Sequence, residues 1–204
     1  DHLIYEEPDN TMWLGAAMSS DRSSVVITSS NSEYTEVRLI PTREPKGEPT
    51  LLIPKSAGIE YYAEPLNIAG EQHLLIQHDY NALNSELVLA DMPREGESLE
   101  EYAQRWVPVI RHSEHVRLEG FTFTATHLVV TARADTTTRI FLAPREQLPI
   151  QWRRRRPAGV TFMEPAGFDE ELYTASVLRA ENYSPVLRIA YPSYLTPRRV
   201  YDYF

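Results

Sequence analysis

Cysteine is absent from this chain of 204 residues, and its absence excludes several kinds of chemistry at once. Without a thiol there can be no disulfide, no thiolate nucleophile and no zinc site built from cysteine. A protein that manages without disulfides is typical of a reducing compartment, so we expect a cytoplasmic protein.

Positive charge is also in short supply. Lys and Arg together number 20 against 29 Asp and Glu, which gives a formal net charge of -9. Nucleic-acid binding requires clustered positive charge, so we expect no nucleic-acid partner. No apolar run approaches the roughly 20 residues of a membrane-spanning helix, so no membrane partner is expected either. The acidic start has no signal-peptide pattern, and it lacks an initiating Met, which suggests that the chain was cut from a longer protein.

Glycine is scarce, with 8 residues against 15 prolines, so the turns must depend on Pro, Asn, Asp and Ser. Between such turns the sequence consists of short runs rich in β-branched and aromatic residues, which predict strands in four sets of four. The expected strands are Leu3–Glu6, Met12–Met18, Ser24–Ser29 and Tyr34–Ile40; Thr50–Ile53, Ile59–Glu64, His73–His78 and Glu86–Ala90; Trp106–Ile110, Val116–Ala125, His127–Arg133 and Thr138–Ala143; Ile150–Arg153, Val160–Met163, Leu172–Val177 and Val186–Tyr191; and finally Val200–Phe204.

One strand of each set, the third in the first three sets and the fourth in the last, has a similar apolar core. These cores begin at Val25, Leu74, Leu128 and Leu187, so they are 49, 54 and 59 residues apart. Four strands in about 45–55 residues is the repeat of a β-propeller blade. The pattern therefore predicts an all-β chain of about four four-stranded antiparallel blades, approximately residues 1–45, 46–95, 106–147 and 148–204. A β-sandwich is the alternative.

One segment is a candidate helix. Ser98 is followed three residues later by Glu101, which is the spacing of a capping box. We expect a short connector helix over Ser98–Arg105, with an irregular acidic loop as the alternative.

A nucleophile elbow is the first catalytic motif to look for in a hydrolase. It requires Gly-x-Ser-x-Gly at a turn from a strand to a helix. The nearest sequence is Gly96-Glu97-Ser98, which lacks the second glycine and the preceding strand. We therefore expect no catalytic residue in this chain.

Histidines offer a possible metal site. His112 and His115 have His-x-x-His spacing, with Glu119 close by, and on a helix both imidazoles would share a face and could bind zinc. The flanking runs are strands, so the pair is expected on a polar turn instead. His73 and His78 end one strand and are expected to be ordinary edge residues. We expect no metal and no cofactor.

Two charged groups have functional alternatives. Arg153–Arg156 could bind an anion or an acidic partner, but a solvated loop or a contact to another domain is the preferred interpretation. Glu6, Glu7 and Asp9, with Asp169–Glu171, raise the alternative of a propeller glycoside hydrolase, which needs two facing carboxylates. Adjacent residues of a strand point to opposite faces, which weakens this alternative.

Motifs in a consistent order connect the chain to a known family. The tail has the pattern Ser-x-x-Thr-Pro-x-x-Val-Tyr-Asp-Tyr, and it resembles a stretch late in the propeller of the prolyl oligopeptidase family, and of its oligopeptidase B branch in particular. The similar segments are Leu3–Asp9, Trp13–Gly15, Thr35–Ile40, Gly58–Tyr61, Val107–His112, Leu118–Phe121, His127–Val130 and Ser193–Phe204. The chain departs from the family pattern at His73–His78, Glu170–Tyr173 and around Thr196-Pro197.

The resemblance also implies a complete fold and an activity, neither of which the residues of this chain indicate by themselves. It implies a seven-bladed propeller that controls the access of short peptides to a C-terminal α/β-hydrolase domain with serine peptidase activity, cut off here before that domain begins. It also implies cleavage after Arg or Lys, or alternatively after Pro, and the Val-Tyr-Asp-Tyr ending favours the former. An incomplete propeller leaves apolar blade faces uncovered, so we expect the chain to self-associate. A free-standing propeller or sandwich that acts as a binding module is the alternative function.

Overall fold

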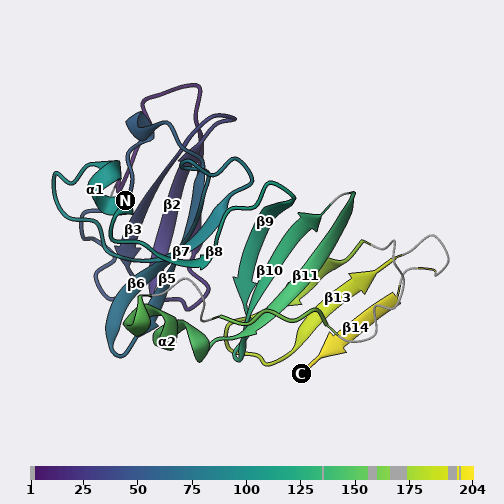
Figure 1. Cartoon of the computed structure of the whole chain (residues 1–204). Helices are drawn as coiled ribbons and strands as arrows, with labels where there is room; N and C mark the ends of the chain where they lie inside the picture. The colour runs from purple at the N-terminus through teal and green to yellow at the C-terminus, as the bar shows by residue number, and fades with distance from the viewer. Residues whose placement is uncertain (1–2, 135, 156–159, 166–173, 193–196, 198) are drawn as a thin grey trace. The chain divides into compact units, whose positions relative to one another are not determined.

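The computed structural model describes residues 3–134, 136–155, 160–165, 174–192, 197 and 199–204. It is an all-β fold with four antiparallel sheets, as the sequence predicts (Figure 1). The chain divides into two compact units, one of residues 1–81 and 87–107 and the other of residues 82–86 and 108–204. Among the described residues, no helix is long and apolar enough to cross a membrane.

The first two sheets have four strands each, and in both the strands pair in chain order. The first sheet is β1-β2-β3-β4 and the second is β5-β6-β7-β8, with the bounds β1 (Trp13–Met18), β2 (Ser24–Ser30), β3 (Thr35–Pro41), β4 (Thr50–Leu51), β5 (Tyr61–Ile68), β6 (Glu71–His78), β7 (Glu86–Asp91) and β8 (Val107–Ile110).

The third and fourth sheets have three strands each and are also meanders. The third is β9-β10-β11, to which Met163 adds a single antiparallel bridge at Leu142, and the fourth is β12-β13-β14. Their bounds are β9 (Val116–Phe123), β10 (His127–Ala134), β11 (Thr137–Pro144), β12 (Ser176–Ala180), β13 (Leu187–Tyr191) and β14 (Arg199–Tyr203).

The predicted grouping of strands is wrong by one strand. Thr50–Leu51 closes the first sheet by pairing with β3, whereas the sequence pattern assigned this run to the second set. In the same way Val107–Ile110 closes the second sheet, and the run at Val200 is the last strand of the fourth sheet rather than a remainder. The expected first strand, Leu3–Glu6, is not a strand. Pairing partners decide the grouping, and a single sequence does not display them.

Two short α-helices lie between strands, the first between β7 and β8 within the second sheet and the second between β11 and β12. Helix α1 (Leu99–Ala103) confirms the predicted capping box: the Ser98 Oγ accepts from the Glu101 amide at 3.3 Å, and the Ser98 amide donates to the Glu101 carboxylate at 2.9 Å. Helix α2 (Gln147–Arg154) replaces the strand predicted at Ile150–Arg153, so that prediction is wrong. Its buried residues are Leu148, Gln151 and Trp152, which follow the helical spacing of three and four residues.

The hydroxyl of Tyr61 joins the first two sheets. Tyr61 begins β5, yet its buried hydroxyl accepts hydrogen bonds from the backbone amides of Val37 at 2.7 Å and Ile53 at 3.1 Å. It also donates to the Ile53 carbonyl at 2.9 Å. The same ring belongs to an apolar core shared by both sheets, which includes Leu39, Leu74 and Val88. A separate core, which includes Val129, Ile140 and Ile189, lies in the other unit.

Candidate functional site

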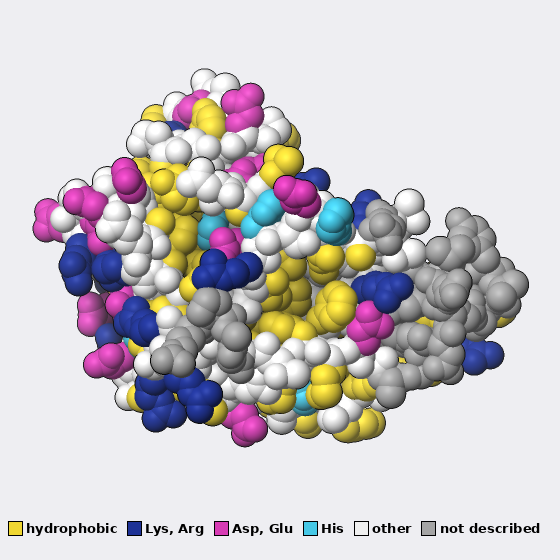
Figure 2. Space-filling view, in the orientation of Figure 1, with side chains coloured by type: hydrophobic (Ala, Val, Ile, Leu, Met, Phe, Trp, Pro, Cys, Tyr) yellow, Lys and Arg dark blue, Asp and Glu magenta, His cyan; other side chains and the backbone are white. Residues whose placement is uncertain are grey.

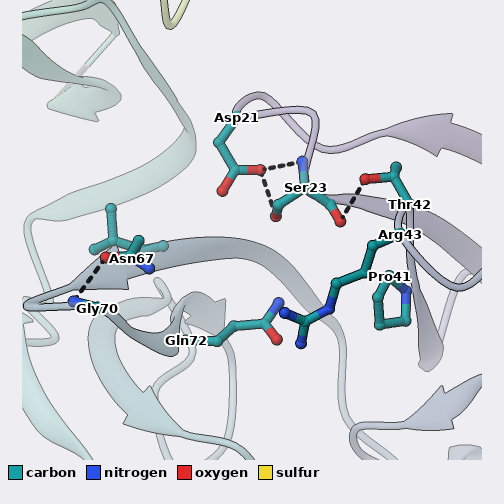
Figure 3. A pocket seen from close by; sticks show the side chains of 9 residues that line it. Asp21, Ser23, Pro41, Thr42, Arg43, Asn67, Gly70 and Gln72 are labelled. Atoms are coloured by element: carbon teal, nitrogen blue, oxygen red, sulfur yellow. Dashed lines mark hydrogen bonds between the residues drawn. The ribbon is translucent and has the colours of Figure 1, made fainter.

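A polar pocket of about 300 Å³ opens among three turns of the first two sheets (Figure 3). The walls come from the β1–β2 turn, the end of β3 with the segment after it, and the β5–β6 hairpin. The lining residues are Asp21, Ser23, Pro41, Thr42, Arg43, Leu66, Asn67, Gly70 and Gln72.

Asp21 holds the first wall in place. Its Oδ1 atom accepts from the Ser23 amide at 2.9 Å, from the Ser23 hydroxyl at 2.7 Å and from the Ser19 hydroxyl at 2.7 Å. Thr42 joins this turn to the end of β3, because its hydroxyl donates to the Ser23 carbonyl at 3.0 Å. The carboxylate of Asp21 is therefore fixed by its own turn, as Asp commonly is in turns.

The β5–β6 hairpin forms the opposite wall. Its two turn residues, Ala69 and Gly70, both have positive φ, 55° and 91°, which is the backbone of a tight two-residue hairpin turn. The Gly70 amide donates to the Asn67 Oδ1 at 3.0 Å, which leaves the Asn67 amide nitrogen available to a ligand. Hydrogen bonds thus preform both walls.

Arg43 is the cation of the pocket. It is exposed, and among the described residues its guanidinium has no hydrogen-bond or ion-pair partner. Figure 3 shows its head and the Gln72 carboxamide pointing toward one another. Sequence reasoning missed this pocket because its polar residues are single members of separate turns and form no motif.

The carboxylate of Glu7, near the N-terminus, is held in hydrogen bonds within the fold. Glu7 accepts from the Lys55 ammonium at 2.7 Å and from the Tyr5 hydroxyl at 3.0 Å. Burial opposes ionisation of Glu7, but the hydrogen bonds from Lys55 and from the Asp9 amide outweigh it and lower the pKa of Glu7 to about 2. A carboxyl group with such a pKa cannot serve as a general acid at neutral pH. The second acidic group, Asp169–Glu171, lies outside the described residues.

The His112 to His115 segment lies on a loop before β9, as predicted. The Asn84 amide holds this loop by donating to the Ser113 carbonyl at 2.8 Å. Glu119 is engaged elsewhere, with Arg133 at 2.6 Å and the Thr138 hydroxyl at 3.2 Å. Within the described ranges, no group of three or more His, Asp or Glu side chains is arranged to hold a metal ion.

His73 and His78 are not edge residues, so that prediction is wrong. Both are only 2% exposed, and β6 is an inner strand of the second sheet. His73 Nδ1 lies 3.1 Å from an Asp91 carboxylate oxygen. His78 packs against Trp106 with ring centroids 4.4 Å apart, and burial lowers the pKa of His78 to about 4.

The arginine run lies at the end of α2. Arg153 and Arg154 complete the last turn, where cations interact favourably with the helix dipole. The Arg155 guanidinium lies 3.8 Å from the centre of the Trp152 ring. Arg156 lies outside the described residues. The run is thus at a helix terminus rather than on the predicted loop after a strand.

The Val-Tyr-Asp-Tyr motif forms β14. Asp202 makes two hydrogen bonds to Arg188 on the neighbouring strand β13, at 2.7 Å and 2.8 Å, and the Arg188 guanidinium lowers the pKa of Asp202. Tyr201 and Tyr203 pack against the core of the second unit. The aspartate of the motif therefore adds an exposed cross-strand ion pair at the position where Arg188 and Asp202 face each other.

Comparisons with known proteins place this fold in a family. The sequence profile of the family described as "Prolyl oligopeptidase, N-terminal beta-propeller domain" matches residues 1–203. Protease 2 of Moraxella lacunata is 27% identical over 203 residues, which cover 98% of this chain and 25% of that protein. Dipeptidyl aminopeptidase BI of Pseudoxanthomonas mexicana is 29% identical over 135 residues, or 66% of this chain and 17% of that protein.

Solved structures share the fold. Oligopeptidase B from Trypanosoma brucei, solved with covalently bound antipain, superposes with a TM-score of 0.72 at 21% identity, over 98% of this chain and 26% of that one. Oligopeptidase B from Leishmania major gives a TM-score of 0.73 at 23% identity, also over 98% of this chain and 26% of that one. The chain thus spans about a quarter of the length of the relatives that it matches over nearly its whole length.

Proposed function

The chain belongs to the prolyl oligopeptidase family as an N-terminal β-propeller domain, and on this premise we propose that it is part of a propeller that controls which peptides reach a serine hydrolase domain of the same protein. The observation that carries this proposal is the family match over residues 1–203. Two others support it: the relatives are about four times as long, and the sequence has no Gly-x-Ser-x-Gly motif.

Each of the four sheets is proposed to be one blade of a seven-bladed ring. Every sheet is antiparallel and is built from one continuous stretch of chain, as a propeller blade is. The limits 1–45, 46–95, 106–147 and 148–204 remain approximate predictions, because the final strands of the first, second and fourth sheets come later in the sequence than the pattern indicated.

The proposed substrates are short peptides, cleaved after Arg or Lys. The similarity to Protease 2 and the Val-Tyr-Asp-Tyr strand support the basic preference. Cleavage after Pro is the competing specificity, since a solved prolyl endopeptidase superposes as well, with a TM-score of 0.73 at 17% identity. We propose a cytoplasmic protein, which the absence of cysteine supports.

A peptidase assay tests this proposal. The full-length gene product should cleave a short Arg-containing peptide, spare the same sequence inside a folded protein, and lose activity to a serine-directed inhibitor. The chain of 204 residues alone should cleave neither substrate. Turnover by the chain alone, or equal cleavage of the folded protein, would contradict the proposal.

Self-association of the chain is a second expected result. All six residues of β1 are exposed, with Trp13 at 82%, and β1 is an edge strand of its sheet. In the other unit, Figure 2 shows hydrophobic side chains gathered over β9, β10 and β11, where an apolar hollow of about 250 Å³ opens. An uncharged, apolar edge strand is a site for pairing with another chain. Light scattering should therefore show a mass that rises with concentration.

Two variants separate the role of the edge strand from exposed apolar area in general. Trp13→Lys should reduce the association, because a lysine on an edge strand opposes pairing. Leu83→Lys is the matched control: Leu83 is 88% exposed but lies on a loop between β6 and β7, so its replacement should leave the association unchanged. A monomer at all concentrations, or equal effects of both variants, would contradict this interpretation.

A further inference from the structure

We propose that the pocket around Arg43 binds the C-terminal carboxylate of a short peptide, with Asp21 receiving donor groups of the same peptide. This inference rests on the proposed function, because it assumes that short peptides enter the propeller. The pocket volume of about 300 Å³ is at the lower end of the range for small-molecule sites, which suits a few residues of peptide.

Arg43 is the group that would recognise the carboxylate. A guanidinium carries five donors in a planar fork, which matches the two oxygens of a carboxylate. In the described part of the chain no carboxylate already occupies this fork, in contrast to Arg105 and Arg188, which are paired with Glu97 and Asp202. Arg43 therefore keeps its full donor capacity for a ligand.

Two amides extend the donor set. The Asn67 side-chain nitrogen is not engaged within the described residues, since only its Oδ1 atom takes part in a hydrogen bond, with Gly70. The Gln72 amide nitrogen makes one long contact of 3.4 Å to the Ser24 hydroxyl. Both residues come from the β5–β6 hairpin, so they are held by the eight-residue pairing of β5 with β6 rather than by a free loop.

The carboxylate of Asp21 favours a peptide over a compact anion such as phosphate. Its Oδ1 atom is saturated by Ser19 and Ser23, whereas its Oδ2 atom makes no hydrogen bond to the described residues. A fixed carboxylate in the pocket repels a compact dianion such as phosphate but attracts the N–H groups or the terminal ammonium of a peptide. The combination of a free guanidinium and a free carboxylate oxygen thus favours a ligand that carries both signs.

The test measures binding to the chain itself by NMR titration, with triglycine, triglycine amide and inorganic phosphate as probes. Triglycine should bind with a dissociation constant on the order of 1 mM and shift the amide signals of Asn67 and Gly70. Removing the terminal carboxylate in triglycine amide, or the guanidinium in Arg43→Gln, should weaken binding by about tenfold, the effect of one charge-assisted pair.

Lys46→Gln is the matched control. Lys46 is exposed, lies three residues after Arg43 on the same segment and does not line the pocket, so its loss removes equal charge and should leave binding unchanged. Arg43 is exposed and without described partners, so Arg43→Gln should fold normally, which circular dichroism verifies.

Four results would overturn the proposal. The first three are an absence of triglycine binding at about 10 mM, equal binding of triglycine and its amide, and phosphate binding as tight as that of triglycine, which would indicate a simple anion site. The fourth is equal weakening of binding by Lys46→Gln, which would attribute the effect to net charge rather than to Arg43. Because no peptidase activity is measured, none of these results contradicts the proposal that the propeller controls which peptides reach the hydrolase domain.

Discussion

Replacing Tyr61 by phenylalanine should lower the free energy of unfolding by about 2–4 kcal/mol, although only one oxygen atom is removed. That oxygen accepts from the amides of Val37 and Ile53 and donates to the Ile53 carbonyl. Tyr61 is 6% exposed, so water cannot replace the lost partner. Each buried group left unpaired costs about 1–3 kcal/mol. Burial also raises the pKa of Tyr61, so the hydroxyl remains a donor at all ordinary pH values.

Urea unfolding followed by circular dichroism measures the effect. The midpoint should fall while the denaturant slope stays constant, which indicates lost stability rather than a changed folded state. Tyr183→Phe is the control, because Tyr183 is 65% exposed and its change should stay within about 0.5 kcal/mol. If both variants lost the same stability, Tyr61 would not be the link between the first two sheets.

Acidification from pH 7 to pH 5 should destabilise the chain by about 2 kcal/mol through His78 alone. Burial lowers the pKa of His78 from 6.5 to about 4, and among the described residues neither of its ring nitrogens has a hydrogen-bond partner. Between these two pKa values His78 is protonated in the unfolded chain but neutral in the folded chain. The stability is therefore complete above pH 6.5 and is lost progressively as the pH falls toward 4.

This pH window separates His78 from the acidic groups. Glu7 and Glu97 have pKa values lowered to about 2, so their contributions are present above pH 4.5 and are lost only below it. His78→Leu should abolish most of the loss between pH 7 and pH 5, because leucine has no proton to bind. His115→Gln, at an exposed loop position, should retain it. Urea midpoints at the two pH values decide the matter, and an unchanged pH dependence in His78→Leu would refute this explanation.

The sequence reveals where strands lie more readily than how they are grouped. Runs such as Ser24–Ser29 are rich in β-branched residues, which marks them as strands in the sequence, and this run forms β2. The grouping fails at β4, because two residues carry no period and only their pairing with β3 assigns them to a sheet. At α2 the apolar run is short, and a short run is compatible with either a strand or a buried helix.

The site is less predictable than the fold, for a physical reason. The misjudged burial of His73 and His78 comes from an inner strand that is covered on both faces and so lacks alternation. Asp21, Arg43 and Asn67 are ordinary turn and surface residues in the sequence, and they become neighbours only when two sheets pack. Glu7 was a candidate acid in the sequence. The fold brings Lys55, 48 residues away, into contact with it, and the hydrogen bond from Lys55 helps to keep Glu7 ionised.

The meander order of the sheets has a consequence for how the chain is made. Within the described residues, every strand of the four sheets pairs only with strands next to it in the sequence, so the strand pairing of each sheet is complete within its own stretch of chain. Contacts of short sequence separation form with little loss of loop entropy and therefore form early. During synthesis from the N-terminus, the first sheet has all its strands once Leu51 has left the ribosome. We expect the chain to acquire its sheets one after another, in the order in which they are translated.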